Sequence, residues 1–209
     1  MPRNEASEIC APNRLWEIAA NILVGTFFLL FAWSFAKDFL ATPRISIFLV
    51  VIKETLDAIF FLCRRLPTQV TSRWLSWTTA IGGTITPLLF RPSGTADFVA
   101  ANVLQTAGLC LQIAAIISLN RSFGIVPANR GIKRNGMYRV VRHPLYSCYT
   151  VTLVGFVINN LSIYNILLLL LTTTFQVVRI FREEELLSLD ADYRQYAKET
   201  KWKLIPFVF

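Results

Sequence analysis

Charged residues are scarce in this chain, and their scarcity argues against a soluble fold. Only 16% of the 209 residues are charged and 54% are hydrophobic, whereas soluble domains average about 25% charged and about 45–50% apolar residues. The balance is nevertheless basic, with a net charge of +8. Nucleic-acid binding would need a basic patch on a soluble fold, but here the basic residues lie between apolar stretches. The composition therefore predicts a membrane protein whose partners are lipids and not nucleic acid.

Patterns for metal binding, disulfide bonding and internal repetition are also missing. The four cysteines include no C-x-x-C pair, so they define neither a disulfide framework nor a zinc site, and we expect no metal. They are best explained as small packing residues: Cys10, Cys63, Cys110 and Cys148. The only histidine, His143, lies in the polar stretch GMYRVVRHPLY, residues 136–146.

The sequence does contain a series of long apolar segments. Because a helix needs about 20 mostly apolar residues to cross a bilayer, we predict an all-α integral membrane protein with about six transmembrane helices. The number falls to five if the second or fifth segment does not cross. The short turn NNLS makes the last two a helical hairpin. The predicted segments are Leu15–Ala36, Ile45–Cys63, Trp74–Phe90, Phe98–Leu119, Leu145–Ile158 and Ile163–Phe181.

The distribution of basic residues predicts the orientation. With the N-terminus inside, 17 of the 21 lysines and arginines fall on cytoplasmic segments, and only Lys37, Arg44 and Arg91 fall on outer loops. Cytoplasmic loops are enriched in these residues. We therefore expect both termini, the His143 segment and a C-terminal helix in the cytoplasm. The membrane would be the inner membrane of a bacterium or the endoplasmic reticulum of a eukaryote. The first segment exceeds the usual apolar core of a signal peptide and is interpreted as an uncleaved anchor.

Three ionisable residues interrupt the second segment: Lys53, Glu54 and Asp57. Ionisable groups inside a span are candidates for function. Lys53 and Asp57 are also four residues apart on one helix face, where they could neutralise each other. We favour this structural pair, and the functional interpretation stays open.

Two polar clusters flank the final hairpin: residues 133–146 before it and residues 179–187 at its end. Antiparallel helices joined by a short turn must return both clusters to one membrane surface. Pro144 is typical of a first helical turn, whose free N–H groups can bind a polar ligand. Arg179 and Glu183 share one helix face. Taken singly, these residues could be a helix cap, interface aromatics or a flanking cation, but their joint order favours a site.

GMYRVVRHPLY, the apolar hairpin, RIFREE, YRQY at 193–196 and Ile205-Pro206 together resemble the isoprenylcysteine carboxyl methyltransferase family, whose wider clan includes phospholipid methyltransferases. The resemblance covers roughly residues 97–209. It divides the chain into N-terminal transmembrane helices without a motif (1–92) and a methyltransferase-like core (93–209).

The resemblance implies a membrane enzyme that uses S-adenosylmethionine without a Rossmann domain, and the sequence has no G-x-G-x-x-G unit. It also implies transfer of the methyl group to a lipophilic or lipidated acceptor, for example the carboxylate of a prenylated cysteine. Arg179 would be the catalytic residue and face the substrate. The residues implied to bind the cofactor are Ile132, Lys133, Tyr138, Arg142, His143, Pro144, Leu145, Tyr146, Glu183 and Glu184.

Two other functions remain open. Membrane sterol reductases share a similar R-H-P-x-Y pattern and use NADPH, although the arginine and paired glutamates of RIFREE favour methyl transfer. A non-enzymatic membrane scaffold is the third interpretation. Binding of S-adenosylhomocysteine, of NADPH or of neither would separate the three.

Overall fold

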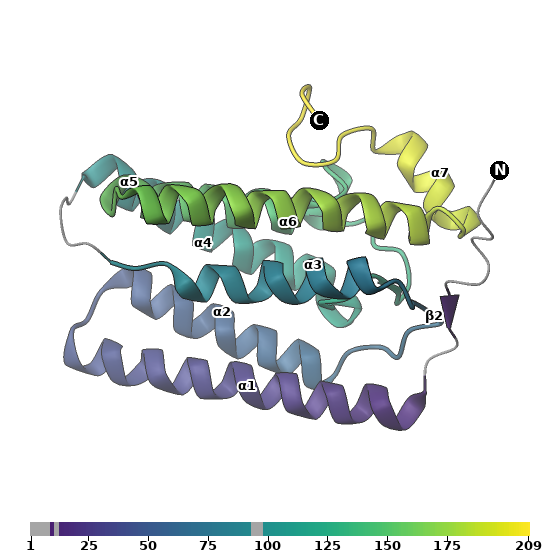
Figure 1. Cartoon of the computed structure of the whole chain (residues 1–209), viewed down its shortest axis with the longest axis horizontal. Coiled ribbons are helices and arrows are strands. Elements are labelled where there is room, and N and C mark those ends of the chain that lie inside the picture. The colour runs from purple at the N-terminus through teal and green to yellow at the C-terminus, as the bar shows by residue number, and fades with distance from the viewer. Residues whose placement is uncertain (1–8, 11–12, 93–97) are drawn as a thin grey trace.

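The computed structural model describes residues 9–10, 13–92 and 98–209. Arg3 and the start of the predicted second part, residues 93–97, lie outside these ranges. The described residues are mostly helical, and Figure 1 shows α1, α2, α3 and α6 running along the long axis. The α-helices are α1 (Arg14–Ala41), α2 (Ile45–Leu62), α3 (Trp74–Ile85), α4 (Val99–Leu119), α5 (Pro144–Asn159), α6 (Ile163–Leu187) and α7 (Ala191–Glu199).

The first six helices coincide with the six apolar segments predicted from the sequence. Three have the length and composition to cross a membrane: Arg14–Ala41, Val99–Ser122 and Ile163–Leu187. The other three are shorter or more charged. α2 contains three ionisable residues, α3 has 12 residues before a 3-10 turn at Thr86–Leu89, and α5 has 16. The helices are therefore confirmed, while six crossings and their orientation stay predictions.

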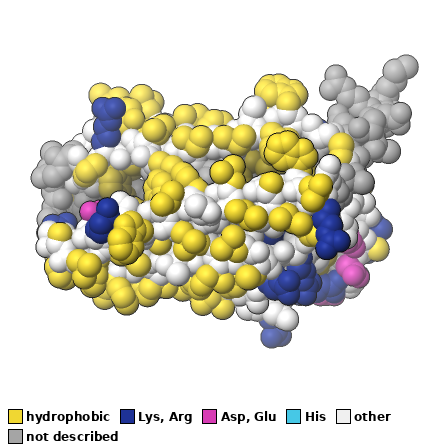
Figure 2. Space-filling view, turned by 90° about the horizontal axis from the view of Figure 1, so that it is seen from below, with side chains coloured by type: hydrophobic (Ala, Val, Ile, Leu, Met, Phe, Trp, Pro, Cys, Tyr) yellow, Lys and Arg dark blue, Asp and Glu magenta, His cyan; other side chains and the backbone are white. Residues whose placement is uncertain are grey.

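The helices pack in pairs that bring the two halves of the chain together. α1 packs against α2, α4 against α2 and α5, and α3 against α6. A core cluster between α1, α2 and α4 includes Phe28, Phe61, Ile116 and Phe123. Many large apolar side chains face outward, and Figure 2 shows them covering much of the face seen from below. An apolar exterior around a packed core is what a lipid-facing bundle requires.

Small residues allow the close approach of α4 and α5. A Cβ atom added at Gly155 would lie 2.7 Å from the backbone nitrogen of Gln105 and 2.9 Å from the carbonyl oxygen of Ala101. Only glycine leaves room for two helix backbones this close.

One end of the bundle carries residues 120–143 and α7, and we call it the polar end. It also holds a three-stranded antiparallel sheet of β1 (Ile9–Cys10), β2 (Gln69–Thr71) and β3 (Ala128–Asn129). The all-α prediction did not include these short strands, since segments of two or three residues leave no periodic pattern. Figure 1 shows α7 and the C-terminus at this end as well.

Candidate active site

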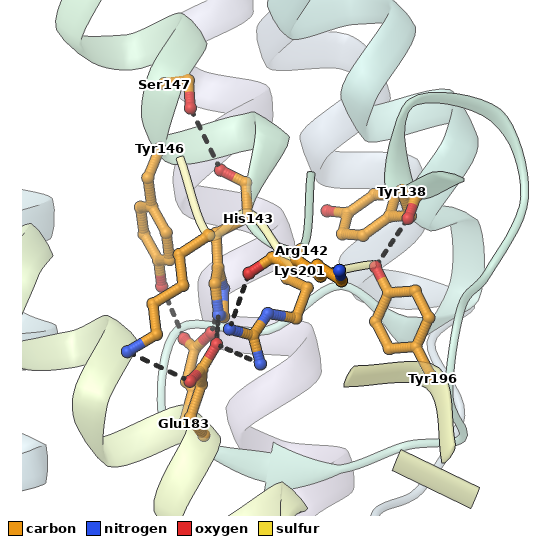
Figure 3. A network of polar contacts seen from close by, with 10 residues as sticks. Tyr138, Arg142, His143, Tyr146, Ser147, Glu183, Tyr196 and Lys201 are labelled. Carbon is orange, nitrogen blue, oxygen red and sulfur yellow. Dashed lines mark hydrogen bonds and ion pairs between the residues drawn. The ribbon is translucent and has the colours of Figure 1, made fainter. Parts of the chain in front are cut away.

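The α5–α6 hairpin brings the two polar clusters into contact, as predicted. α5 begins at Pro144 and α6 ends at Leu187, so Tyr146 and Glu183 both lie at the polar end. The Tyr146 hydroxyl donates a hydrogen bond of 2.5 Å to Glu183 Oε1. Figure 3 shows this contact beside His143, whose Nδ1 lies 3.6 Å from Glu183 Oε2.

A second network surrounds Glu184 and holds the His143 loop against the C-terminal tail. Glu184 Oε1 lies 3.2 Å from Arg142 Nη1 and 3.2 Å from His143 Nε2, and Glu184 Oε2 lies 3.4 Å from Lys203 Nζ. The backbone N–H groups of Arg142 and His143 donate to the carbonyls of Trp202 and Lys203. The tail thus closes over the start of α5, with both nitrogens of His143 near carboxylates.

A cavity of about 380 Å³ opens beside these contacts. Two of the residues implied by the resemblance do not line it: Pro144, which opens α5, and Glu184, which joins the loop to the tail. The other nine do, and the structure therefore brings together Ile132, Lys133, Tyr138, Arg142, His143, Leu145, Tyr146, Arg179 and Glu183.

Two charged residues that line this cavity, Glu183 and Arg179, lack ordinary ion-pair partners among the described residues. Among the described residues, no lysine or arginine lies within ion-pair distance of Glu183, and no carboxylate lies within that distance of Arg179. Arg179 Nη2 donates to the carbonyl of Ile125 at 2.7 Å, its Cζ lies 5.1 Å from the centre of the Tyr146 ring, and its Nε has no hydrogen-bond partner there. Arg179 is only 7% exposed, and a buried charge without an opposite charge is costly. The two residues therefore favour a polar ligand that has both a positive and a negative group.

Tyrosines from two segments, the turn before α5 and α7, line the cavity. The Tyr196 hydroxyl donates a 2.6 Å hydrogen bond to the carbonyl of Tyr138, which fixes α7 against the turn before α5. Burial raises the pKa of Tyr138 well above its ordinary value and that of Tyr196 to about 12. Both side chains are therefore neutral hydroxyls near neutral pH. The buried Tyr193 hydroxyl has no hydrogen-bond partner in the described part of the chain and lines the cavity.

Sequence reasoning missed several residues of the cavity wall. Arg130 is buried, with Nη2 3.4 Å from Glu17 Oε2, and burial lowers its pKa. The YRQY sequence indicated Tyr193 and Tyr196 as part of the resemblance but assigned them no role. Of the lining residues contributed by the first three helices, the sequence singled out only Lys53, Glu54 and Asp57, as ionisable groups inside an apolar segment. No local signal identifies the others, because their place in the cavity depends on how α1, α2 and α3 pack.

The comparison with protein families identifies the same half of the chain. Residues 96–193 match the family described as phospholipid methyltransferase, the relative that the sequence resemblance named. No curated protein matches the chain. The matched range contains Tyr138, His143, Tyr146, Arg179 and Glu183 and excludes α1, α2 and α3. The match and the apolar helices together indicate a membrane methyltransferase.

Proposed function

Because residues 96–193 match the phospholipid methyltransferase family, we propose that this protein is an S-adenosylmethionine-dependent methyltransferase acting on a lipophilic acceptor in the membrane. The observation that carries the proposal is the contact between Tyr146 and Glu183 across the hairpin, at a cavity where Glu183 has no lysine or arginine partner among the described residues. The family match does not depend on this geometry, so the two support the proposal independently.

The chemistry of the cavity fits the proposed cofactor, which supplies the methyl group from a positively charged sulfonium. Glu183 would hold that positive charge, because opposite charges attract strongly in a poorly solvated site. Tyr146 and His143 would fix the direction of the Glu183 carboxylate. The free hydroxyl of Tyr193 and the first-turn N–H groups of α5 would serve the cofactor's polar ends.

Arg179 would hold the acceptor beside this site. Its guanidinium retains an Nε–H without a hydrogen-bond partner among the described residues, and it suits an anionic or carbonyl oxygen. The carboxylate of a prenylated cysteine is one acceptor of this kind. A carboxylate or thiolate acceptor is already nucleophilic, so the protein's contribution is positioning, which can lower a barrier by several kcal/mol.

An NADPH-dependent reductase of the sterol type is the second candidate. The observation in its favour is the set of cations in the cavity wall, Arg130, Lys133 and Arg142, which could meet a 2′-phosphate. Thermal unfolding of the purified protein distinguishes the two, because a ligand that binds the folded state raises its melting temperature. We expect S-adenosylhomocysteine to raise it and NADPH to leave it unchanged.

The proposal is tested by measuring S-adenosylmethionine binding calorimetrically in Glu183→Gln and His143→Ala. A hydrogen bond to a charged group contributes about 1.5–3 kcal/mol, so affinity should fall at least about tenfold in Glu183→Gln. The loss should be larger for S-adenosylmethionine than for neutral S-adenosylhomocysteine. Glu185→Gln is the matched control, since Glu185 contacts Arg73 and Arg182 and does not line the cavity. Unchanged binding in both site variants would contradict the assignment.

A further inference from the structure

A group of three ionisable side chains lies on α2, outside the range that matches the family. Lys53 Nζ contacts Glu54 Oε1 at 2.7 Å and Asp57 Oδ2 at 3.0 Å. The pairing predicted between Lys53 and Asp57 is therefore confirmed. Glu54 and Asp57 are both buried, and Asp57 is only 1% exposed. A single lysine cannot balance two carboxylates, so the group carries a net charge of about −1 when all three are ionised.

Asp57 is also short of hydrogen bonds. Asp57 Oδ2 lies 3.0 Å from Lys53 Nζ, whereas Oδ1 has no hydrogen-bond partner in the described ranges. A buried carboxylate oxygen without a donor is costly. A purely structural pair would need only one carboxylate, so the second one leaves a surplus acceptor and a surplus negative charge.

The group lines the same cavity as Glu183 and Arg179. Four phenylalanines of α1 line it as well: Phe27, Phe28, Phe31 and Phe35. The cavity is thus lined by the charged residues of the candidate site, by a surplus carboxylate and by an aromatic wall from α1, whose Phe28 ring lies 5.9 Å from Lys53 Nζ. This combination suits an amphiphile with a donor-bearing head and an apolar chain.

We propose that Glu54 and Asp57 form a second head-group subsite in this cavity, which binds a hydrogen-bond-donating group, an amine or a hydroxyl, of a lipophilic acceptor. Its chain would lie along Phe27, Phe31 and Phe35. Lys53 is the positioning residue that holds the two carboxylates. A ligand whose only polar group is a carboxylate is repelled here and has its place at Arg179. The proposal rests on the proposed function in one respect, that the bound molecule is the methyl acceptor.

The test uses the full-length protein in a neutral detergent and measures saturable thermal stabilisation by dodecylamine, dodecanol and dodecanoate. These probes share one chain and differ in the head. In Asp57→Asn we expect the half-saturating concentration of dodecylamine or dodecanol to rise at least about tenfold, the size expected for losing a hydrogen bond to a charged group. Stabilisation by dodecanoate should not change. Asp38→Asn is the matched control, because Asp38 is exposed on α1 and does not line the cavity.

Stabilisation by S-adenosylhomocysteine reports that each variant is folded. If Asp57→Asn fails this check, Glu54→Gln supplies the same readout. Binding of the amine alone, or of the amine and the alcohol, supports the subsite and identifies its preferred head. Unchanged half-saturation in a folded variant overturns it. Failure of the proposed function is a separate result: the wild-type protein would bind dodecylamine without responding to S-adenosylhomocysteine.

Discussion

Tyr146 joins the two helices of the candidate site through a single hydroxyl. Its oxygen donates to Glu183, and its ring lies under the guanidinium of Arg179. The side chain therefore contacts both unmatched charges of the cavity. The hydroxyl and the ring can be separated by substitution, which allows the contribution of the hydrogen bond to be measured by itself.

At the residue scale, Tyr146→Phe removes the hydrogen bond to Glu183 and retains the ring beneath Arg179. We expect S-adenosylmethionine affinity to fall by about 1.5–3 kcal/mol, because the bond is to a charged group, with little change in unfolding temperature. Calorimetric titration measures the effect. Tyr164→Phe is the control, since the Tyr164 hydroxyl donates to the carbonyl of Leu89 and neither residue lines the cavity. An equal loss in both variants would contradict a specific role for Tyr146.

At the scale of elements, the position of the site depends on how closely the helices approach one another. α5 carries His143 and Tyr146 at its start and packs along α4, while α6 carries Arg179 and Glu183. α7 contributes Tyr193 and Tyr196. α5 and α7 each make a contact that can be altered outside the cavity.

The first such contact is Gly155, where a side chain would meet backbone atoms of Gln105 and Ala101 that cannot move aside. Gly155→Ala should lower the free energy of unfolding by about 1–3 kcal/mol, as overpacking does. Thermal unfolding in detergent measures the loss. Gly25→Ala is the comparison, because its new Cβ would meet mainly the Leu62 side chain, which can rotate. A larger loss at Gly25 would argue against this packing.

The second contact is the cap of α7. Asp190 Oδ1 accepts from the N–H of Asp192, and Oδ2 accepts from Asn129 Nδ2, both at 2.8 Å. The hydrogen bond from Asn129 is the main reason that the pKa of Asp190 is lowered. A lowered folded pKa means that the stabilisation is present above the unfolded value of about 3.9 and is lost as the pH falls through the folded value.

Asp190→Ala should therefore fray α7 by roughly 0.5–2 kcal/mol, the usual cost of removing an N-cap. Amide hydrogen exchange across Ala191–Glu199 measures this, and acidification of the wild-type protein below about pH 3.9 should reproduce it. Asp190→Asn keeps a capping side chain and should exchange nearly as slowly as wild type at neutral pH. Equal protection in Asp190→Ala would show that α7 is held by packing alone.

At the scale of the whole molecule, the helices form a bundle whose outer surface is largely apolar and which has one polar end. Residues 120–143, the small sheet and α7 gather at the polar end, while the turn between α5 and α6 lies at the opposite one (Figure 1). The charge distribution predicts that the polar end faces the cytoplasm.

Labelling of single cysteines with an impermeant maleimide tests this orientation in a variant lacking the four native cysteines. Leu161, 65% exposed in the α5–α6 turn, and Lys198, exposed on α7, are suitable positions. In intact bacterial spheroplasts, Leu161→Cys should be labelled directly and Lys198→Cys only after permeabilisation. Labelling of both from one side would contradict the predicted crossing of this hairpin.

The sequence by itself determined the six apolar helices, the final hairpin and the meeting of Tyr146 with Glu183, because long apolar runs and a short turn are local properties. It also identified Lys53 and Asp57 as an ion pair, since residues four apart share a helix face. Only the tertiary structure decided that this pair lines the cavity of the candidate site, that Glu184 binds the C-terminal tail, and that Arg130 and Tyr193 enter the wall. These are contacts between segments distant in the chain, and they depend on how whole helices pack, which no local pattern records.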